Sequence, residues 1–239
     1  MVNSLASSFR RAECDGLQTA IGDAHVTFRC AGSLLFHATR TLVVADLHFE
    51  KGSAYARRGQ LLPPFDTRAT LGRLEAEIAA VRPRALVFLG DSFHDGDGEA
   101  RLHPSDADRL GDLATGRDLV WIVGNHDRDG PRALAGRVLA ELEVEGVALR
   151  HEPLAPAGEP EVVGHLHPCA RVSAQGRSVR RRCFVTDGQR LVMPAFGAFT
   201  GGLNVLNPAF HGLFGAPPLV AAMGRSRVHA IGWRSLLPD

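Results

Sequence analysis

Short runs of apolar residues, separated by glycine, proline and polar residues, make up the hydrophobic pattern of this chain. Three runs are too short for helices and rich in β-branched residues, which predicts buried strands at Arg40–Ala45, Ala85–Leu89 and Leu119–Val123. Between them, apolar residues recur at helical spacing over Asp66–Val81 and Pro104–Thr115. This alternation of strand and helix predicts an α/β fold with a parallel core.

The flanks of this core carry turn and helix-start signals. Tight turns separate three apolar pieces, which predicts antiparallel strands at Leu17–Ile21, His25–Arg29 and Ser33–His37. We expect Asp66 to cap the first helix and Pro104 to stand near the first turn of the second.

The second half of the chain alternates strand-like pieces with glycine-rich turns. After a short helix beyond Pro131, strands are expected at Val138–Val144, Gly146–Arg150, Glu161–Val163, Ala170–Val172, Val179–Thr186, Arg190–Met193, Gly202–Leu206 and Val228–Gly232. Residues 209–222 hold too many prolines and glycines for an assignment. We expect one domain over residues 1–239, with residues 1–16 as a loose N-terminal arm.

Polar side chains that can bind a metal or move a proton follow the ends of the predicted strands. In open α/β sheets, ligands bind beyond the carboxyl ends of strands. A lone histidine is more often structural than functional, but here the same placement recurs in five clusters. They are Asp46 with His48, Asp91 with His94, Asn125 with His126, His151 alone, and His165 with His167.

These clusters supply a mixed set of oxygen and imidazole ligands, which suits manganese, iron or zinc. The set is too large for one catalytic ion that must keep an open position. It is large enough for two ions that share a bridging carboxylate. Such a pair clamps the attacking and leaving oxygens of a phosphoryl displacement and lowers the pKa of a bridging water. The ligands alone therefore predict hydrolysis of a phosphate ester.

The motif order DxH, GDxxH, GNHD, H and GHxH, over residues 46–167, resembles the calcineurin-like metallophosphoesterase family. The resemblance implies a four-layer α/β sandwich of two mixed β-sheets flanked by helices. It also implies the ligand sets: Asp46, His48, Asp91 and His167 for one ion, and Asp91, Asn125, His151 and His165 for the other, with Asp91 bridging.

By the same resemblance His126 is catalytic and not a ligand: it faces the phosphate, stabilises the transition state and protonates the leaving oxygen. Many members have an acid where His94 stands, and that acid orients this histidine. Here Asp95 or Asp127 would have to orient it. The segment GDSFH resembles the nuclease subunit of the double-strand-break repair complex, where its histidine contacts the scissile phosphate, which implies DNA as the substrate.

Three longer segments, ADLHFEKGSAYARRGQLLPP, GDSFHD and PAFGAFTGGLNVL, resemble the bacterial ligase-associated DNA-damage-response endonucleases (the PdeM group). That resemblance implies a DNA phosphodiesterase, an endonuclease or an end-processing nuclease, acting on single strands or ends. Two divalent ions are expected, Mn²⁺ in the first place, with Fe or Zn as alternatives. A DNA ligase and a helicase of the same gene cluster are the implied partners.

Basic side chains after the first motif are candidates for substrate binding. Lys51, Arg57 and Arg58 could grip phosphates beside the scissile one, or they could form a solvated helix face. For Arg177 with Arg180–Arg182, exposed strand charge is the favoured interpretation and a nucleic-acid contact the alternative.

Two further features lie close to the motifs in sequence. Pro194–Gly202 is rich in glycine but has no phosphate-loop lysine, and we expect a loop that packs near the site. Cys169 could be an extra ligand, but a buried structural thiol is the favoured interpretation.

Composition narrows the class of protein. A hydrophobic fraction of 45% and a charged fraction of 22% are those of a soluble globular protein. The net charge of +1 gives no global signature of nucleic-acid binding. The four cysteines have no zinc-site or disulfide spacing, and neither a signal peptide nor a membrane span is evident. We therefore expect a cytoplasmic protein without a membrane partner.

Three alternative functions stay open. The same metals could serve a small-molecule phosphodiesterase or phosphatase, for example one for 2′,3′-cyclic nucleotides. A lipid-precursor pyrophosphatase would need an amphipathic, membrane-facing cap, and the sequence contains no convincing basic amphipathic helix. A non-catalytic scaffold of this fold can lose ligands or the catalytic histidine, whereas all are present here. The oligomeric state is open.

Overall fold

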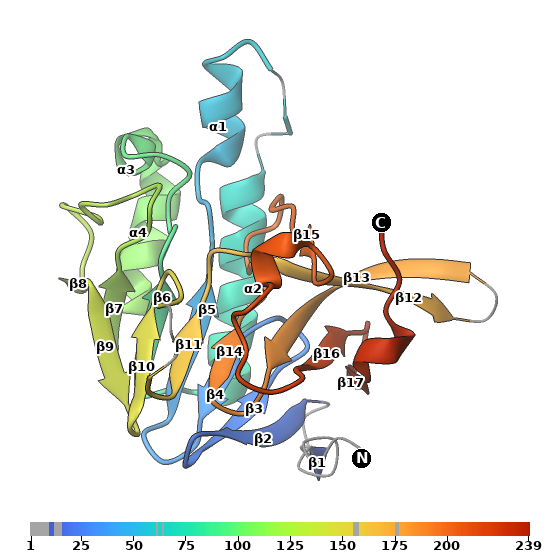
Figure 1. Cartoon of the computed structure of the whole chain (residues 1–239). Helices are drawn as coiled ribbons and strands as arrows, with labels where there is room; N and C mark the ends of the chain where they lie inside the picture. The colour runs from blue at the N-terminus through green and yellow to red at the C-terminus, as the bar shows by residue number, and fades with distance from the viewer. Residues whose placement is uncertain (1–9, 12–15, 61, 64, 155–157, 175–176) are drawn as a thin grey trace.

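The computed structural model describes residues 10–11, 16–60, 62–63, 65–154, 158–174 and 177–239. Two mixed β-sheets form its centre (Figure 1). The predicted α/β class with two mixed sheets is confirmed. Most of the predicted N-terminal arm lies outside the described residues, and Arg10–Arg11 form a short strand.

The first sheet has eight strands in sequential order. They are β1 (Arg10–Arg11), β2 (Leu17–Ile21), β3 (Ala24–Phe28), β4 (Leu34–Phe36), β5 (Thr41–Ala45), β6 (Ala85–Leu89), β7 (Asp118–Ile122) and β8 (Arg137–Leu139). Strands β5 to β8 are parallel, and β1 to β5 pair antiparallel. The three predicted core strands are therefore neighbours whose carboxyl ends lie at one edge.

The second sheet has nine strands, with β10, β11 and β14 parallel. They are β9 (Glu141–Val144), β10 (Val147–Arg150), β11 (Glu161–Val163), β12 (Pro168–Ala174), β13 (Arg177–Thr186), β14 (Arg190–Val192), β15 (Leu203–Asn204), β16 (Leu219–Met223) and β17 (Val228–Ile231). Strand β16, which covers the last four of the unassigned residues 209–222 and Met223, pairs with β13, because apolar residues follow its proline-rich approach.

Three apolar cores define the layers. The inner faces of the two sheets share one core, in which Phe28 stacks on Phe184 at 4.6 Å between ring centroids. The helices α2 (Asp66–Val81) and α4 (Pro104–Leu113) cover the outer face of the first sheet. Two shorter helices, α1 (Lys51–Ala56) and α3 (Gly98–Arg101), stand beside them (Figure 1).

The outer face of the second sheet is not covered by the helical layer that we expected. Its core is covered by loops and by two short 3₁₀ helices, η2 (Pro208–Phe210) and η3 (Trp233–Ser235). The proline- and glycine-rich residues 207–218 do not support a longer helix. None of the helices in the described residues is long and apolar enough to cross a membrane.

The prediction of a short helix after Pro131 is wrong, since residues 132–136 form bends. The Glu99 carboxylate accepts hydrogen bonds from the backbone amides of Arg132, Ala133 and Leu134. Three consecutive amides are thus bound by a side chain from another element, and the segment follows that contact instead of its own helical preference.

The predicted N-cap role of Asp66 is also wrong. Phe65 occupies the N-cap of α2 without a side-chain hydrogen bond, and Asp66 is the first helical residue. Its buried carboxylate instead accepts from the backbone amide of Gly52 at 3.0 Å. It therefore ties the start of α2 to α1. Pro104 stands in the first turn of α4, as predicted.

A buried ion pair links neighbouring strands of the second sheet. Arg190 on β14 pairs with Glu161 on β11, and both side chains are only 1% exposed. Glu161 also accepts from Arg150 on β10 at 2.8 Å. Burying these charges is tolerated only because they are paired, so removing Arg190 leaves the buried Glu161 charge compensated by Arg150 alone.

Replacing Arg190 by methionine is expected to lower the free energy of unfolding by about 3–5 kcal/mol, because Glu161 keeps a buried charge without this partner. Denaturant titration of the variant beside the parent chain measures this. Arg132→Gln is the control, since its pair with Asp129 is 79% and 74% exposed and contributes at most ~1 kcal/mol. Equal losses in the two variants would contradict the structural role of the buried pair.

Candidate metal centre

The predicted clusters lie beyond the carboxyl ends of strands from both sheets. Asp46, Asp91 and Asn125 follow β5, β6 and β7 of the first sheet. His151 and His165 follow β10 and β11 of the second. The fold therefore brings five separate segments to one place, and each contributes at least one donor side chain.

Backbone pairing continues past the strand ends and fixes the first two motifs against each other. The amide of Asp46 donates to the Gly90 carbonyl at 3.2 Å, and that of His48 to the Asp91 carbonyl at 2.9 Å. Phe49 then donates to Ser92 at 2.8 Å. The two loops thus extend β5 and β6 in register, which sets the spacing of their side chains.

One cluster consists of Asp46, His48 and His167. His167 Nε2 lies 3.2 Å from Asp46 Oδ1 and 3.3 Å from His48 Nε2. Asp46 is fully buried, and its two carboxylate oxygens also accept from the backbone amide of His165, at 3.2 and 3.1 Å. Two ring nitrogens and a carboxylate oxygen therefore converge on one point.

A second cluster consists of Asn125, His151 and His165. The side-chain oxygen Oδ1 of Asn125 lies 3.0 Å from His151 Nε2 and 2.9 Å from His165 Nδ1. The two imidazoles are 3.2 Å apart at these nitrogens. This group joins the GNHD loop of the first sheet to two loops of the second.

Asp91 lies between the clusters, and its two carboxylate oxygens make different contacts. Its Oδ1 accepts from the backbone amide of His126 at 2.9 Å. Its Oδ2 lies 3.4 Å from His151 Nε2 and 3.8 Å from His48 Nε2. One oxygen thus holds the GNHD loop while the other faces both clusters, as a bridging ligand would.

Three glycines make room for ligand side chains of other motifs. A Cβ at Gly90 would lie 2.1 Å from His151 Nδ1, and one at Gly124 would lie 2.2 Å from Asp91 Oδ1. At Gly164 it would lie 2.7 Å from Asp46 Oδ2. The glycine that precedes each of these motifs therefore accommodates a ligand from a different motif.

The backbone at the site is strained. Five of the nine non-glycine residues with positive φ in the described chain are expected ligands, with φ between 45° and 67°. They are Asp46, His48, Asp91, His165 and His167. Such conformations cost of order 1–3 kcal/mol each and concentrate at functional sites.

The electrostatics of the cluster fit divalent cations. Burial lowers the pKa of His48 to about 3, so the ring is neutral and offers a lone pair. Burial opposes ionisation of Asp91, but the hydrogen bond and charge of His151 outweigh it and the pKa falls to about 2. Burial also favours neutral His151, yet the carboxylates of Asp91 and Asp46 raise its pKa. The neutral His48 ring and the ionised Asp91 carboxylate are donors of the kind that a metal ion requires, and the raised pKa of His151 shows that the two carboxylates stabilise a positive charge at this place.

His126 is oriented differently from our expectation. Its Nδ1 donates to the backbone carbonyl of His94 at 2.9 Å, which points Nε2 toward Asp91 Oδ2 at 3.9 Å. Asp95 instead pairs with Arg101 at 2.7 Å. A main-chain oxygen, which sequence reasoning does not reveal, thus takes the place of the acid that we expected.

Asp127 is buried and does not orient His126 either. Its carboxylate accepts from the backbone amides of Ser92, Phe93 and Gly124, at 2.8, 3.1 and 3.0 Å. Burial raises its pKa to about 6, against the lowering effect of these amides. The residue therefore holds the GDSFH and GNHD loops together behind the site.

His94 lines the rim of the site beside Tyr55, which sequence reasoning missed. The His94 ring stacks on His126 with centroids 5.6 Å apart and lies 5.5 Å from the Tyr55 ring. Burial and the nearby charge of Lys51 lower the pKa of His94. Tyr55 lies four residues after Lys51 on α1, and this helical spacing indicates that the two side chains lie on the same face of the helix.

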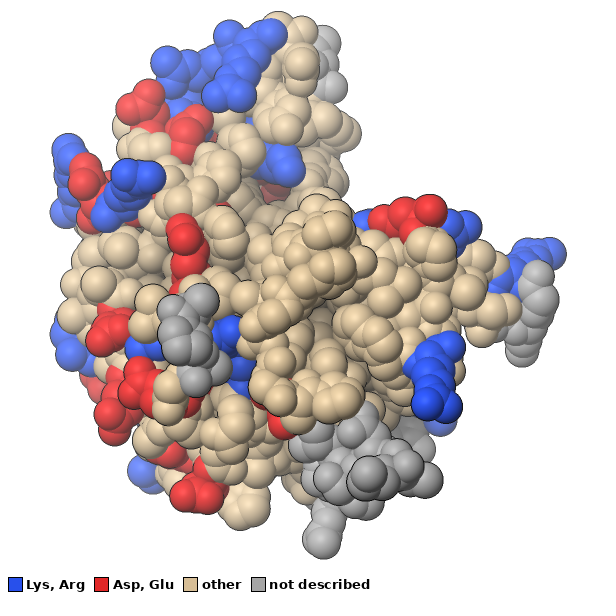
Figure 2. Space-filling model, in the orientation of Figure 1, with Lys and Arg blue, Asp and Glu red and all other residues tan. Residues whose placement is uncertain are grey.

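The three candidate basic residues lie on α1 and the turn after it, at the end of the molecule where Figure 2 shows a group of basic side chains. Lys51 Nζ donates to the Phe199 carbonyl at 3.1 Å. The charge of Arg58 contributes to the lowered pKa of His94. Arg57 pairs with Asp97 at 3.2 Å in solvent. The charges of Lys51 and Arg58 thus act on His94, whereas Arg57 is engaged with Asp97.

The loop Pro194–Gly202 packs against the site, as predicted: the amide of Gly197 donates to the carbonyl of Asp46 at 3.1 Å. Cys169 is 4% exposed, and burial raises its thiol pKa. It belongs to none of the potential metal-binding groups in the described residues.

Comparison with known proteins agrees with this geometry. The model of the calcineurin-like phosphoesterase family matches residues 39–170. The nuclease MPE of Pseudomonas putida has a similar crystal structure, with a TM-score of 0.70 and 30% sequence identity, covering 90% of this chain and 100% of that one. The phosphoesterase Yfce of E. coli is 13% identical with a TM-score of 0.39, covering 80% and 98%, and it supports no conclusion.

No curated protein matches the sequence. The family match covers more than half of the chain and includes every cluster of the site. The chain belongs to the calcineurin-like phosphoesterases, a family of metal-dependent phosphoric ester hydrolases.

Proposed function

We propose that this protein hydrolyses phosphodiester bonds of DNA, as an endonuclease or end-processing nuclease, with two divalent metal ions. The observation that carries the proposal is the single Asp91 oxygen that faces both donor clusters. The likeness to a nuclease over 90% of the chain supports the choice of nucleic acid. A role in DNA repair, beside a ligase and a helicase, rests on the sequence segments that resemble damage-response endonucleases.

Seven side chains would hold the ions. Asp46, His48, Asp91 and His167 would bind one, and Asp91, Asn125, His151 and His165 the other. The ions would supply Lewis acidity and lower the pKa of a water molecule. Mn²⁺ suits this mixture of nitrogen and oxygen donors, as Fe or Zn would.

His126 is the proposed general acid. Its Nδ1 is committed to the His94 carbonyl, so only Nε2 can carry a proton to the leaving oxygen. His94, whose ring stacks on that of His126, is the proposed contact for the scissile phosphate. Lys51 and Arg58 are the proposed contacts for the flanking phosphates, with a weaker contribution from Arg57, which is engaged with Asp97.

A small-molecule phosphodiesterase is the second candidate. A cavity of about 530 Å³ beside Asn125 and His126 is of the size that small ligands occupy. Its lining holds five carboxylates against two arginines, Arg128 and Arg132, although Asp95, Asp97 and Asp129 each pair with an arginine. The charge of the cavity thus argues against a cyclic nucleotide within it.

The first test is an assay of metal-stripped protein refilled with Mn²⁺ on single-stranded DNA, a 2′,3′-cyclic nucleotide and bis-p-nitrophenyl phosphate. We expect DNA cleavage, and a His126→Ala variant that keeps its metal but loses about 10²–10⁴-fold in turnover, because the proton donor is gone. Turnover of the small esters alone would reject DNA as the substrate. Undiminished cleavage by the variant would reject His126 as the acid.

Asp91→Ala is expected to lose both ions, because one carboxylate oxygen faces both clusters. Elemental analysis after gel filtration measures the metal per chain. Asp95→Ala is the matched control, since that carboxylate pairs with Arg101 and should leave metal content unchanged. Two ions per chain in the Asp91 variant would contradict the bridging assignment.

Gly90→Ala is expected to displace His151 and weaken binding of one ion by about 10–100-fold, since the new Cβ would overlap the ring. Calorimetric titration with Mn²⁺ measures the affinity. Gly96→Ala, in the same connection, is the control because a Cβ there meets no atom within 4 Å. Similar affinities for the two variants would disprove the steric role of Gly90.

A further inference from the structure

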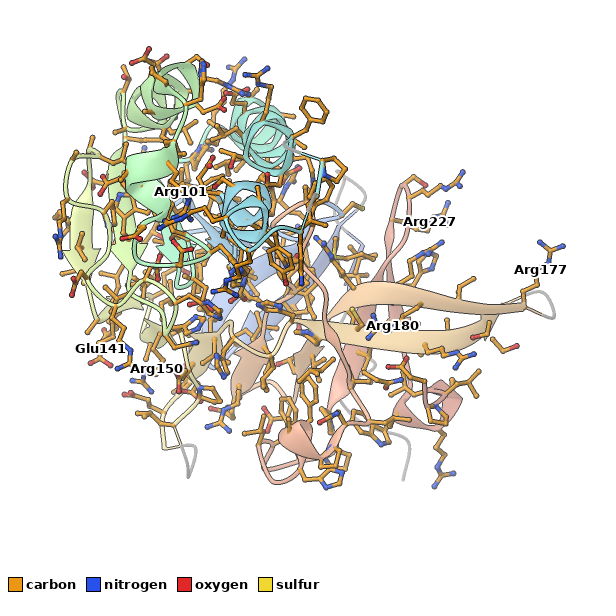
Figure 3. The ribbon with its side chains drawn as sticks, turned by 90° about the horizontal axis from the view of Figure 1, so that it is seen from above. Arg101, Glu141, Arg150, Arg177, Arg180 and Arg227 are labelled. Carbon is orange, nitrogen blue, oxygen red and sulfur yellow. The ribbon has the colours of Figure 1, made fainter. Side chains whose placement is uncertain are left out.

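The hairpin of β12 and β13 projects from the body of the protein (Figure 1). It begins at Pro168, directly after His167 of the metal centre. Viewed from above, Arg180 lies on the part of the hairpin near the body and Arg177 near its tip (Figure 3). The hairpin thus leads from the metal centre into solvent.

Pairing of the two strands divides the hairpin arginines between its faces. Arg171 is opposite Arg180, and Cys169 is opposite Arg182. Because paired residues share a face and side chains alternate, Arg171, Arg180 and Arg182 lie on one face. Arg177 and Arg181 lie on the other. We call the first group the arginine face.

The arginine face is continuous with the metal centre through the loop Pro194–Gly202. Arg182 donates to the carbonyls of Ala195 and Thr200, at 2.9 and 3.0 Å. Lys51 donates to Phe199 in the same loop, and the loop also binds the backbone of Asp46. Lys51 on α1 and Arg182 on the hairpin therefore contact the same loop, and the Arg182 guanidinium is committed to its carbonyls.

Little negative charge compensates this face. Arg180 Nε lies 3.2 Å from Asp239 Oδ1, with the two side chains 41% and 53% exposed. The part of the hairpin that the structure describes makes no other ion pair. Water and salt screen such an exposed pair, so another anion can replace the carboxylate. The Asp239 carboxylate therefore occupies a position at which Arg180 can bind the oxygen of another anion.

We propose that the arginine face binds the phosphate backbone of the DNA strand as it leaves the metal centre. The proposal rests on the proposed function and names the part of the substrate beyond the scissile bond. At ~3.3 Å per residue, Arg171 is ~10 Å along the strand from Pro168. With phosphates at least ~3.4 Å apart, this position serves a phosphate within about three nucleotides of cleavage.

Charge on exposed strands also prevents edge-to-edge aggregation, and that role is the competing explanation. That role requires exposed charge, but it does not distinguish one face of the hairpin from the other. Binding of a strand that passes through the metal centre requires the face that adjoins the loop Pro194–Gly202. The two explanations therefore differ in which arginines matter.

The test compares Arg171→Gln/Arg180→Gln with Arg177→Gln/Arg181→Gln, which removes equal charge from the opposite face. Substrates are a long single strand of about twenty nucleotides, a dinucleotide and bis-p-nitrophenyl phosphate. For the arginine-face variant we expect a higher KM on the long strand only. Its slope of log KM against log salt should fall by about 1.4, since each phosphate contact to a single strand contributes ~0.7.

Two further variants distinguish a loss of phosphate binding from a folding defect. Arg180→Lys should preserve the salt slope because it keeps the charge. Asp239→Asn should lower KM on the long strand, because it removes the competing carboxylate. A KM and salt slope unchanged in the arginine-face variant, or changed equally in both double variants, would overturn the proposal.

Failure of the proposed function gives a different result. A parent chain that hydrolyses bis-p-nitrophenyl phosphate but cuts no DNA would reject the nuclease assignment, and the hairpin proposal with it. DNA cleavage that is insensitive to Arg171 and Arg180 would reject the hairpin proposal alone.

Discussion

The buried carboxylate of Asp91 is the group on which the rest of the site depends. It is 2% exposed, and its charge persists because the His126 amide and neighbouring imidazoles compensate it. A buried anion without such partners would take up a proton. The His126 amide that helps to keep Asp91 ionised also fixes the GNHD loop. The charge state of Asp91 and the geometry of this loop therefore depend on each other.

The site also joins the two sheets. Asp46, Asp91 and Asn125 come from the first sheet, and His151 and His165 from the second. A cation bound by both sets exists only when the sheets are packed together, so binding it would stabilise the folded chain by mass action. The strained left-handed residues are held by this packing, which explains how the fold maintains conformations that short peptides avoid.

Much of this arrangement could be predicted from the sequence. The strand ends at Ala45, Leu89 and Ile122 are encoded by local patterns, and the polar residues beyond them indicated where the site lies. What failed depends on contacts between distant segments. The helix expected after Pro131 is replaced by hydrogen bonds to Glu99, and the orienting acid expected for His126 is replaced by a main-chain oxygen of His94. Glu99 and the His94 carbonyl are distant in sequence from the residues that they contact, so the local sequence pattern does not reveal either contact.

The interlocking glycines have a consequence for how such a site can change. Gly90 accommodates His151, Gly124 accommodates Asp91, and Gly164 accommodates Asp46, so each motif occupies space that another leaves free. The effect of a substitution in one motif then depends on which residue occupies its counterpart, and neighbouring effects of this kind are not additive. Single motifs are therefore poor units for transplantation between relatives. The exchangeable unit is the whole set of loops, inherited together.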